Sequence, residues 1–337
     1  MRVIRGRGVE EVFQIAVMHM RSGEMIEMDS RNGPVLMFPE PVTSVYVFPD
    51  ERVLFDPHRN CNPFFHFIEG LWMIAGRNDL DTLTMFAKKM ADFSDDGILV
   101  NGAYGYRWRE WFGRDQLETA IYLLRTNPLD RRVVLQMWDS EADLASSSKD
   151  VPCNTQVYFK ARPIKHRDAE REKEYALDMM VTNRSNDLIW GAYGANAVHF
   201  SMVQEYVAAM VDMDLGKYYQ VSNNAHVYKE VWEPLEAKLH KGYMADPYEL
   251  TEIEPWPLVV DRDSFDGELE TFFWWLHEGD NFGYAYKNDI FSGTAIPMVS
   301  AWWLYKEGML PDAIEVAKGI VATDWRKACV EWLQRKK

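Results

Sequence analysis

The most informative stretch of the sequence is Thr182-Asn183-Arg184-Ser185-Asn186-Asp187, followed by Ile189-Trp190-Gly191-Ala192-Tyr193-Gly194-Ala195-Asn196. A β-rich pattern precedes it and an amphipathic pattern over 199–213 follows it, which predicts a strand-to-helix junction. Arg184 with Ser185 can bind a phosphate, because a guanidinium group forms paired charge-assisted hydrogen bonds and a hydroxyl adds another donor. Asn196 has an amide donor and a carbonyl acceptor that can read a nucleobase, although an ordinary helix cap fits it equally well.

A cysteine stands at a second predicted junction, Val151-Pro152-Cys153-Asn154, between a serine-rich loop and a strand. A thiol in this position can face a cavity and act as a nucleophile. A cysteine inside a protein is more commonly a small hydrophobic residue. These four residues alone therefore leave both roles open.

Length and charge restrict the classes of function. The chain has 337 residues, with 52 acidic side chains against 37 Lys and Arg, and a net charge of −15. This acidic balance argues against binding of a nucleic acid through its phosphates, which needs a basic face.

The longest apolar stretch, 64–76, is shorter than the roughly 20 residues that a bilayer requires, and the amino terminus lacks the apolar core of a secretory signal. We expect a cytoplasmic protein without membrane contact.

Several cofactor sites are not expected. Cys61, Cys153 and Cys329 are far apart and odd in number, which indicates neither a disulfide framework nor a C-x-x-C metal site. The eight histidines form no H-E-x-x-H pair, so no catalytic metal is implied. The segment Gly6-Arg7-Gly8 lacks the third glycine and the preceding strand of a dinucleotide site, and there is no P-loop. We therefore expect neither a nicotinamide nor an ATP site.

Strands and helices are mixed along one chain without a repeat or a linker. We predict strands at 35–38, 42–48, 52–55, 133–135, 157–161 and 175–182, and helices at 64–75, 115–126, 199–213, 272–276, 298–306 and 313–322. The charged run 165–173 is expected to be a solvated hairpin loop. The length allows two domains or one large α/β or α+β domain, and the portion after about residue 230 is the least informative.

Glu69 stands in a helical segment that is apolar on every side. Burial of a carboxylate costs several kcal/mol unless the group is paired, protonated or used. The position therefore marks either a functional acid or a paired core glutamate.

Motifs spread over residues 30–228 occur together in one order. They are Ser30-Arg31-Asn32-Gly33, Glu69-Gly70-Leu71-Trp72, Gly102-Ala103-Tyr104-Gly105-Tyr106-Arg107-Trp108-Arg109, Asp130-Arg131-Arg132, Pro152-Cys153, Asn183 to Asp187 with Gly191 and Asn196, and Asn224-Ala225-His226-Val227-Tyr228. Each is weak alone. In this order and at this spacing they resemble the thymidylate synthase family, which includes the pyrimidine nucleotide hydroxymethylases.

The resemblance implies a fold and a reaction. The fold is a single α+β domain over 1–337, with a mixed β-sheet covered by helices and a divergent helical portion over about 230–337. Two copies pair sheet to sheet in a homodimer. The reaction transfers a one-carbon unit from 5,10-methylenetetrahydrofolate to carbon 5 of a pyrimidine nucleoside monophosphate. Addition of the Cys153 thiolate at carbon 6 would make carbon 5 nucleophilic, and neighbouring arginines would favour ionisation of the thiol.

The resemblance also implies roles for individual residues. Those expected to act in catalysis are Cys153, Glu69, Tyr104, Asp187 and Asn196. Those expected to bind the nucleotide are Arg31, Arg184 and Ser185 at the phosphate, Arg131 and Arg132 reaching the phosphate from the other subunit, Asn196 at the base, and His226 and Tyr228 at the sugar. Those expected to lie against the folate are Asp187, Gly191, Met90 and Phe93.

Departures from the family pattern bear on the product. Thymidylate synthases carry a tryptophan pair where this chain has 90–93, and Asn154 replaces the histidine that follows the nucleophile. Tyr158 replaces an expected glutamine, and the chain ends in Gln334-Arg335-Lys336-Lys337 instead of an apolar tail. A weaker seal admits water to the intermediate. We therefore expect a hydroxymethyl product, with reductive methylation to dTMP as the alternative.

The base is read from the residue that matches a family asparagine, where Asn goes with uracil and Asp with cytosine. Asn196 predicts dUMP. The spacing from Asp187 is one residue longer than usual, so Ala195 is a second candidate and a dCMP or CMP hydroxymethylase remains open. Ser185 is compatible with deoxyribose but does not exclude ribose. A rival of another class is a nucleotide-binding homologue without activity.

Overall fold

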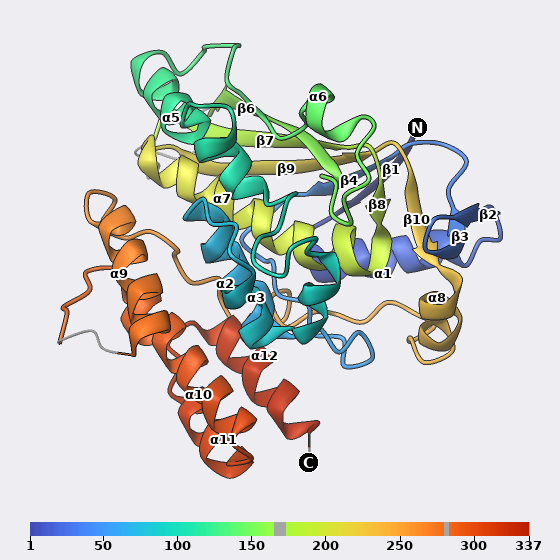
Figure 1. Cartoon of the computed structure of the whole chain (residues 1–337). Helices are drawn as coiled ribbons and strands as arrows, with labels where there is room; N and C mark the ends of the chain where they lie inside the picture. Colours follow the sequence, from blue (N-terminus) through green and yellow to red (C-terminus); the bar gives the residue numbers. More distant parts are fainter. Residues whose placement is uncertain (165–172, 280–282, 337) are drawn as a thin grey trace.

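The computed structural model describes residues 1–164, 173–279 and 283–336 and contains two sheets covered by helices (Figure 1). The larger sheet mixes parallel and antiparallel neighbours in the order β1-β4-β9-β7-β6-β5. Its strands are β1 (Arg2–Gly6), β4 (Val42–Tyr46), β5 (Val134–Gln136), β6 (Asn154–Pro163), β7 (Tyr175–Asn183) and β9 (Asp214–Ser222). The smaller sheet, in the order β2-β3-β10-β8, consists of β2 (Ile26–Ser30), β3 (Gly33–Met37), β10 (Ala225–Tyr228) and β8 (Asn186–Asp187). The predicted α+β class is confirmed.

The helices of the described residues range from one turn to four. They are α1 (Val9–Met20), α2 (Pro63–Ile74), α3 (Leu80–Phe86), α4 (Tyr104–Tyr106), α5 (Gln116–Thr126), α6 (Ser140–Asp143), α7 (Asn196–Met210), α8 (Lys229–Glu236), α9 (Phe265–Glu278), α10 (Ile296–Lys306), α11 (Leu310–Lys318) and α12 (Thr323–Gln334). Irregular helical segments are η1 (Lys88–Phe93), η2 (Arg107–Trp111), η3 (Leu188–Ala195) and η4 (Ile290–Ala295). Within the described ranges no helix is long and apolar enough to cross a bilayer.

The core forms where α7 packs on β7 and β9 and α2 packs on α7. Asn62 starts α2 by accepting a hydrogen bond from the backbone N–H of Phe65, and Pro63 occupies the first turn, where its missing N–H costs nothing. The apolar residues of α2 are buried on almost every side because α7 covers one face and α12 another. This explains the pattern that predicted a buried helix.

The segment 52–55 is not a strand, contrary to the prediction. The backbone N–H of Phe55 donates to the Glu10 carboxylate of α1 at 2.8 Å, and buried Arg52 forms an ion pair with Glu205 of α7. The backbone N–H of Phe55 is therefore not available for strand pairing, and the Arg52 side chain ties the segment to α7. The predicted hairpin loop lies outside the described residues except for Lys173, but its two flanking strands, β6 and β7, pair antiparallel.

The helices after α8 pack against α2 and extend the core. In Figure 1 the orange and red helices α9 to α12 lie together, with α12 beside α2. Trp302, Trp325 and Trp332 contact the rings of Phe64 and Phe67 of α2, with centroids 5.0–5.8 Å apart. Trp302 and Trp325 therefore belong to the core. The predicted helix at 313–322 is in fact the end of α11 and a turn, and α12 follows it.

Candidate active site

Cys153 lies at the start of β6, beside the end of β7. The two strands are antiparallel, so Asn154 pairs with Asn183. The backbone N–H of Arg184 donates to the carbonyl of Cys153 at 2.9 Å. The thiol and the junction at 182–196 are thus brought together by the β6–β7 pairing.

Two arginines hold the loop that carries the cysteine. Arg184 donates from Nε to the Pro152 carbonyl at 2.8 Å and from Nη2 to the Val151 carbonyl at 2.9 Å, and this Nη2 lies 3.9 Å from Sγ of Cys153. Arg31, from the turn between β2 and β3, donates to the Lys149 carbonyl at 3.3 Å. Both guanidinium groups remain exposed enough to meet an anion.

The electrostatic setting of the thiol corrects one expectation. Burial raises the pKa of Cys153 above its usual value, Arg184 and Arg31 lower it, and Asp150 and Asp187 raise it further. The arginines therefore favour the thiolate, as predicted, but burial outweighs them in the free protein. A bound dianionic phosphate would pair with the arginines, so ionisation of the thiol depends on more than their presence.

The Arg184→Gln variant is expected to alkylate more slowly at Cys153. Removing the guanidinium takes away the largest influence that lowers the thiol pKa, so less thiolate is present at any pH below that pKa. The rate of iodoacetamide modification, followed on the Cys153 peptide by mass spectrometry, should fall severalfold and its pH profile should move upward. Arg184→Lys, which keeps the charge, should lie between this variant and the wild type. An unchanged profile in Arg184→Gln would show that the guanidinium does not act on the thiol.

A chain of side-chain amides runs from the core to the residue after the nucleophile. Gln220 donates to the Ala192 carbonyl at 3.5 Å and to the Tyr218 hydroxyl at 2.9 Å, and its Oε1 accepts from Asn186 at 2.6 Å. Oδ1 of Asn186 accepts from Nδ2 of Asn196 at 3.1 Å, and Oδ1 of Asn196 accepts from Nδ2 of Asn154 at 3.3 Å. A carbonyl can only accept, so the Ala192 carbonyl requires the NH2 group of Gln220 to point toward it. This choice then sets which end of Asn186, Asn196 and Asn154 donates and which accepts.

Gly191 is required by the same chain. A Cβ atom at this position would lie 2.6 Å from Oδ1 of Asn186 and 3.1 Å from Nδ2 of Asn196. Any side chain would therefore disrupt the amide pair. The structure gives Gly191 this packing reason, beside the folate contact that the family resemblance implies.

Glu69 of α2 faces a histidine of α7. Its Oε2 lies 3.1 Å from Nε2 of His199, and their side chains are 16% and 4% exposed. The angles are not those of a formed hydrogen bond, and both atoms are buried without another partner. The ring of His66 lies 6.2 Å from that of His199 and perpendicular to it. Burial and then the neighbouring His199 lower the pKa of His66 to about 3, so His66 is neutral.

Tyr104 lies beside the cysteine loop. Burial, then Cys153 and Asp150, raise the pKa of its phenol well above the usual value. The loop around Tyr104 is fixed in two places. Asp150 accepts from the backbone N–H of Gly102 at 2.7 Å, and fully buried Arg107 pairs with Asp143 at 2.6 Å.

Asp187 combines a capping role with an unused oxygen. Its Oδ1 accepts from the backbone N–H groups of Ile189 and Trp190, each at 2.7 Å, which starts η3. Its Oδ2 is buried without a partner, and burial raises the pKa of the carboxyl. The β8–β10 pairing puts His226 opposite Asp187. An orphan acceptor in a buried position suits a ligand that brings an N–H group.

Four further predicted residues are two expected at the nucleotide, Ser185 and Tyr228, and two expected at the folate, Met90 and Phe93. Ser185 is half-buried next to Arg184, and the ring of Tyr228 packs 5.5 Å from that of His226. Phe93 is 46% exposed at the end of η1, in a segment that Lys149 joins to the cysteine loop by donating to the Ser94 carbonyl. Met90, in the same segment, packs partly against the core.

Arg131 and Arg132 lie away from the cysteine. They precede Val133, whose carbonyl accepts from the backbone N–H of Phe159, and Arg132 pairs with Asp130. Phe159 is six residues beyond Cys153 along β6, a separation of about 20 Å in a strand. The two exposed arginines cannot therefore complete the site of their own subunit.

His199 and Asn186 are the site residues that sequence reasoning missed. His199 stands three residues after Asn196 on one helix, and residues at this spacing share a face. That spacing is the signal that could have found it. Asn186 was part of a quoted motif but had no role assigned to it.

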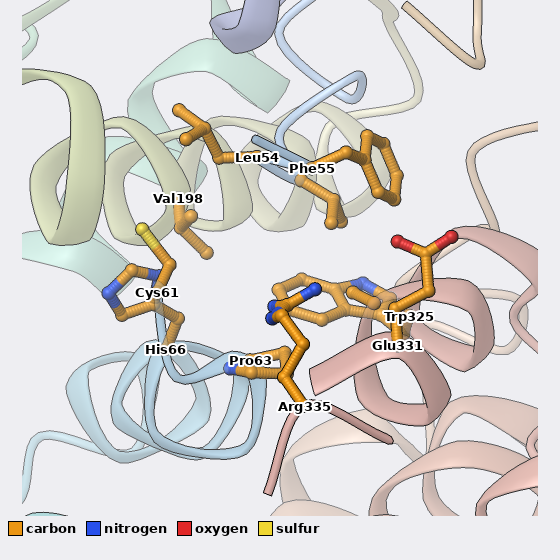
Figure 2. Close-up of a pocket in the computed structure, with 11 residues that line it drawn as sticks. Leu54, Phe55, Cys61, Pro63, His66, Val198, Trp325, Glu331 and Arg335 are labelled. Carbon is orange, nitrogen blue, oxygen red and sulfur yellow. The ribbon is translucent and has the colours of Figure 1, made fainter. Parts of the chain in front are cut away.

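A pocket opens behind the site, between α2, α7 and α12. Figure 2 shows Cys61 and His66 on one side of it and, on the other, Trp325 and Glu331 of α12 and Arg335, which directly follows that helix. None of the residues predicted for catalysis lines it. In the ranges that the structure describes, no group of His, Cys, Asp or Glu side chains is arranged to hold a metal ion.

Comparison with known proteins gives a consistent result. A family model described as thymidylate synthase matches residues 60–256. The chain is 45% identical over its whole length, and over 95% of the relative, to a protein of Pseudomonas phage M6 named deoxyuridylate hydroxymethyltransferase. It is 37% identical over 56% of its length to a protein of the same name from Bacillus phage SP01, covering 49% of that relative. A thymidylate synthase of Streptococcus mutans is 28% identical over 44% of this chain and 57% of its own length.

Proposed function

Because this chain belongs to the thymidylate synthase family, we propose that it transfers a one-carbon unit from 5,10-methylenetetrahydrofolate to carbon 5 of dUMP and releases 5-hydroxymethyl-dUMP. The observation that carries the proposal is the meeting of Cys153, Arg184 and Arg31 at one loop, beside Asn196 and Tyr104. The name of the phage M6 relative supports the uracil base and the hydroxymethyl product.

The first step uses Cys153 and the arginines. Arg184, Arg31 and Ser185 hold the phosphate of dUMP, which places carbon 6 of the ring at the thiolate. A bond forms between Sγ and carbon 6, and the electron pair of the C5–C6 double bond moves toward the carbonyl oxygen at position 4. The resulting enolate makes carbon 5 a nucleophile. His226 and Tyr228 orient the sugar.

The folate fits the orphan oxygen of Asp187. Oδ2 is a buried acceptor without a partner, and a pterin ring brings N–H donors of the required kind. When bound, 5,10-methylenetetrahydrofolate supplies a carbon at the oxidation level of formaldehyde. Gly191, Met90 and Phe93 contribute the surface against which it lies. Tyr104 stays a neutral phenol at physiological pH, so it holds the water that removes the proton from carbon 5 instead of removing the proton as a phenolate.

The last step decides the product. Once the proton has left carbon 5 and the folate has separated, the nucleotide carries an exocyclic methylene group. Glu69 positions a water that adds to this group, and the tryptophan-free segment around Met90 and Phe93, with Phe93 half exposed, leaves room for it. Reductive methylation would instead need a hydride at this carbon with water excluded.

The direction of the amide chain supports uracil. Asn196 retains one amide hydrogen and one lone pair beyond those that Asn186 and Asn154 occupy. In the uracil-reading orientation, Oδ1 accepts from N3–H and Nδ2 donates to the oxygen at position 4. Cytosine presents the reverse pattern of donors and acceptors. To read it, the Asn196 amide would have to rotate by half a turn and lose its hydrogen bonds to Asn186 and Asn154. Ala195 has no polar side chain and cannot replace it in this role.

Product analysis tests the base and the reaction together. Purified protein with 5,10-methylenetetrahydrofolate should convert dUMP to a nucleotide heavier by one CH2O unit and leave dCMP unchanged. Turnover of dCMP in preference to dUMP would contradict the reading of Asn196. Binding of dUMP without any turnover would favour the non-catalytic homologue.

We propose that two copies pair through the outer face of the larger sheet. Val134, Tyr158, Met180 and Tyr219 lie side by side in register across β5, β6, β7 and β9, and all four are partly or fully exposed. Such an apolar row is typical of an interface. Pairing would let Arg131 and Arg132 reach the phosphate site of the partner. We place the enzyme in the cytoplasm, which suits its unpaired thiols.

Subunit mixing tests the shared site. The Cys153→Ala protein and the Arg131→Ala/Arg132→Ala protein should each have little activity. Unfolded together and refolded, they should recover roughly a quarter of wild-type activity, because half of the dimers then contain one site with both intact parts. Mixing Cys153→Ala with Arg184→Ala, whose lesions lie in the same site, is the control that should restore nothing. Equal recovery in both mixtures would contradict the assignment of Arg131 and Arg132 to the partner's site.

A further inference from the structure

We propose that His199 is a positioning residue that acts through Glu69 and fixes the carboxylate for attack by water on the exocyclic methylene group. This inference rests on the proposed function. It begins from a contact between two helices: Nε2 of His199 lies 3.1 Å from Oε2 of Glu69, and each atom is buried without another hydrogen-bond partner. Two orphan polar atoms that face one another at this distance form a hydrogen bond after a small rotation.

The contact distinguishes the two oxygens of Glu69. If Nε2–H of His199 donates to Oε2, the carboxylate plane is fixed and Oε1 is left for a water. Glu69 keeps 16% of its side chain exposed, whereas His199 keeps only 4%. The carboxylate can therefore meet the substrate side, while the imidazole remains behind it.

The neighbours of His199 fit a supporting role. His66 is the other titratable side chain against its ring, and it is neutral. Arg59 influences His66 but pairs with the Ile189 and Tyr193 carbonyls. Glu69 is thus the anion that the His199 imidazole meets in the described contacts.

The step balances with one proton on Glu69. The water oxygen bonds to the methylene carbon, and the π electrons of the exocyclic double bond move into the ring as an enolate. The water gives one proton to Oε1 of Glu69 and keeps the other in the new CH2OH group. The enolate then re-forms the C5–C6 double bond, the bond from carbon 6 to Sγ breaks, and Cys153 leaves as the thiolate. No oxidant or reductant is needed.

A double-mutant cycle with Glu69 tests the inference. His199→Leu should lower kcat for 5-hydroxymethyl-dUMP by about 10- to 100-fold, less than the roughly 10²- to 10⁴-fold effect of removing the acid or base itself, with little change in KM for dUMP. His199→Gln keeps a side-chain donor and should recover part of the rate. In a Glu69→Gln background, His199→Leu should have almost no further effect, because two residues that act as one unit are not additive. His66→Leu is the matched control in the same layer and should leave kcat unchanged.

The outcomes separate two failures. If His199→Leu lowers kcat equally with and without Glu69, or if His66→Leu has the same effect as His199→Leu, the histidine acts only on packing and the inference is wrong. Thermal unfolding of each variant shows a loss of folding directly, and His199→Gln then carries the comparison. If the wild-type protein makes dTMP or no product from dUMP, the proposed function fails and this inference fails with it.

Discussion

Replacing Cys153 with alanine is expected to lower the formation of 5-hydroxymethyl-dUMP by about 10⁴-fold or more, which is typical of removing a covalent nucleophile. Without Sγ no bond forms at carbon 6, so carbon 5 never becomes nucleophilic. The binding of dUMP should change little, because Arg184 and Arg31 keep their hydrogen bonds to backbone carbonyls of the cysteine loop. The measurements are product formation by mass spectrometry and the dUMP dissociation constant by calorimetry.

Cys61→Ala is the matched control for this variant. Cys61 lines the pocket of Figure 2, outside the cysteine loop, and should be dispensable for turnover. Substantial activity in Cys153→Ala, or a comparable loss in Cys61→Ala, would contradict the assignment of the nucleophile.

Replacing Glu69 with glutamine is expected to lower turnover by about 10²- to 10⁴-fold, the range for a positioned acid or base. Glutamine keeps the size of the side chain and its place against His199 but cannot accept a proton from water. Release of tritium from carbon 5 of labelled dUMP and formation of the hydroxymethyl product should be followed in one reaction. A fall in product that exceeds the fall in tritium release would locate the main defect at the attack of water.

Glu10→Gln is the matched control for Glu69. Glu10 of α1 is also a buried glutamate. Burial raises its pKa to about 7, and its carboxylate accepts a hydrogen bond from the backbone N–H of Phe55. It has no part in the proposed reaction, so kcat should be unchanged. Wild-type turnover in Glu69→Gln would show that the carboxylate is not needed.

The parts of the site that were predictable from sequence are those in which chain order dictates proximity. Cys153 precedes β6 and the Arg184 segment follows β7, so their meeting required only that the two strands form a hairpin. The helix that carries Glu69 was predictable because its apolar pattern permits no exposed face. The first of these features needs only the pairing of β6 with β7, and the second needs only the local sequence of the helix.

Other features depend on packing that sequence does not specify. The contact of Glu69 with His199 exists because α2 crosses α7 in one particular register, and the amide chain needs four segments to converge. The pKa of Cys153 was judged from its arginines alone, since the depth of burial is a property of the whole fold. The prediction of a strand at 52–55 was wrong for the same reason. Phe55 forms a hydrogen bond with Glu10 of α1, and Arg52 forms an ion pair with Glu205 of α7.

The proposed pairing of two copies and the packing after residue 230 also depend on features that sequence alone does not specify. The apolar row at Tyr158 and Met180 follows from strand alternation once the register is known, yet neither residue signals an interface by itself. Trp302 of α10 and Trp325 of α12 pack on the core, and only the structure identifies Phe64 and Phe67 as their partners.

The most direct test of the central claim is the origin of the new oxygen atom. The reaction of dUMP with 5,10-methylenetetrahydrofolate should be run in water enriched in oxygen-18, and the product should be analysed by mass spectrometry. We expect a nucleotide that has gained one CH2O unit, with the heavy oxygen in the new hydroxymethyl group. A gain of CH2 alone, with no label and with dihydrofolate formed, would show that hydride and not water completes the reaction, and would contradict the proposed hydroxymethyl transfer.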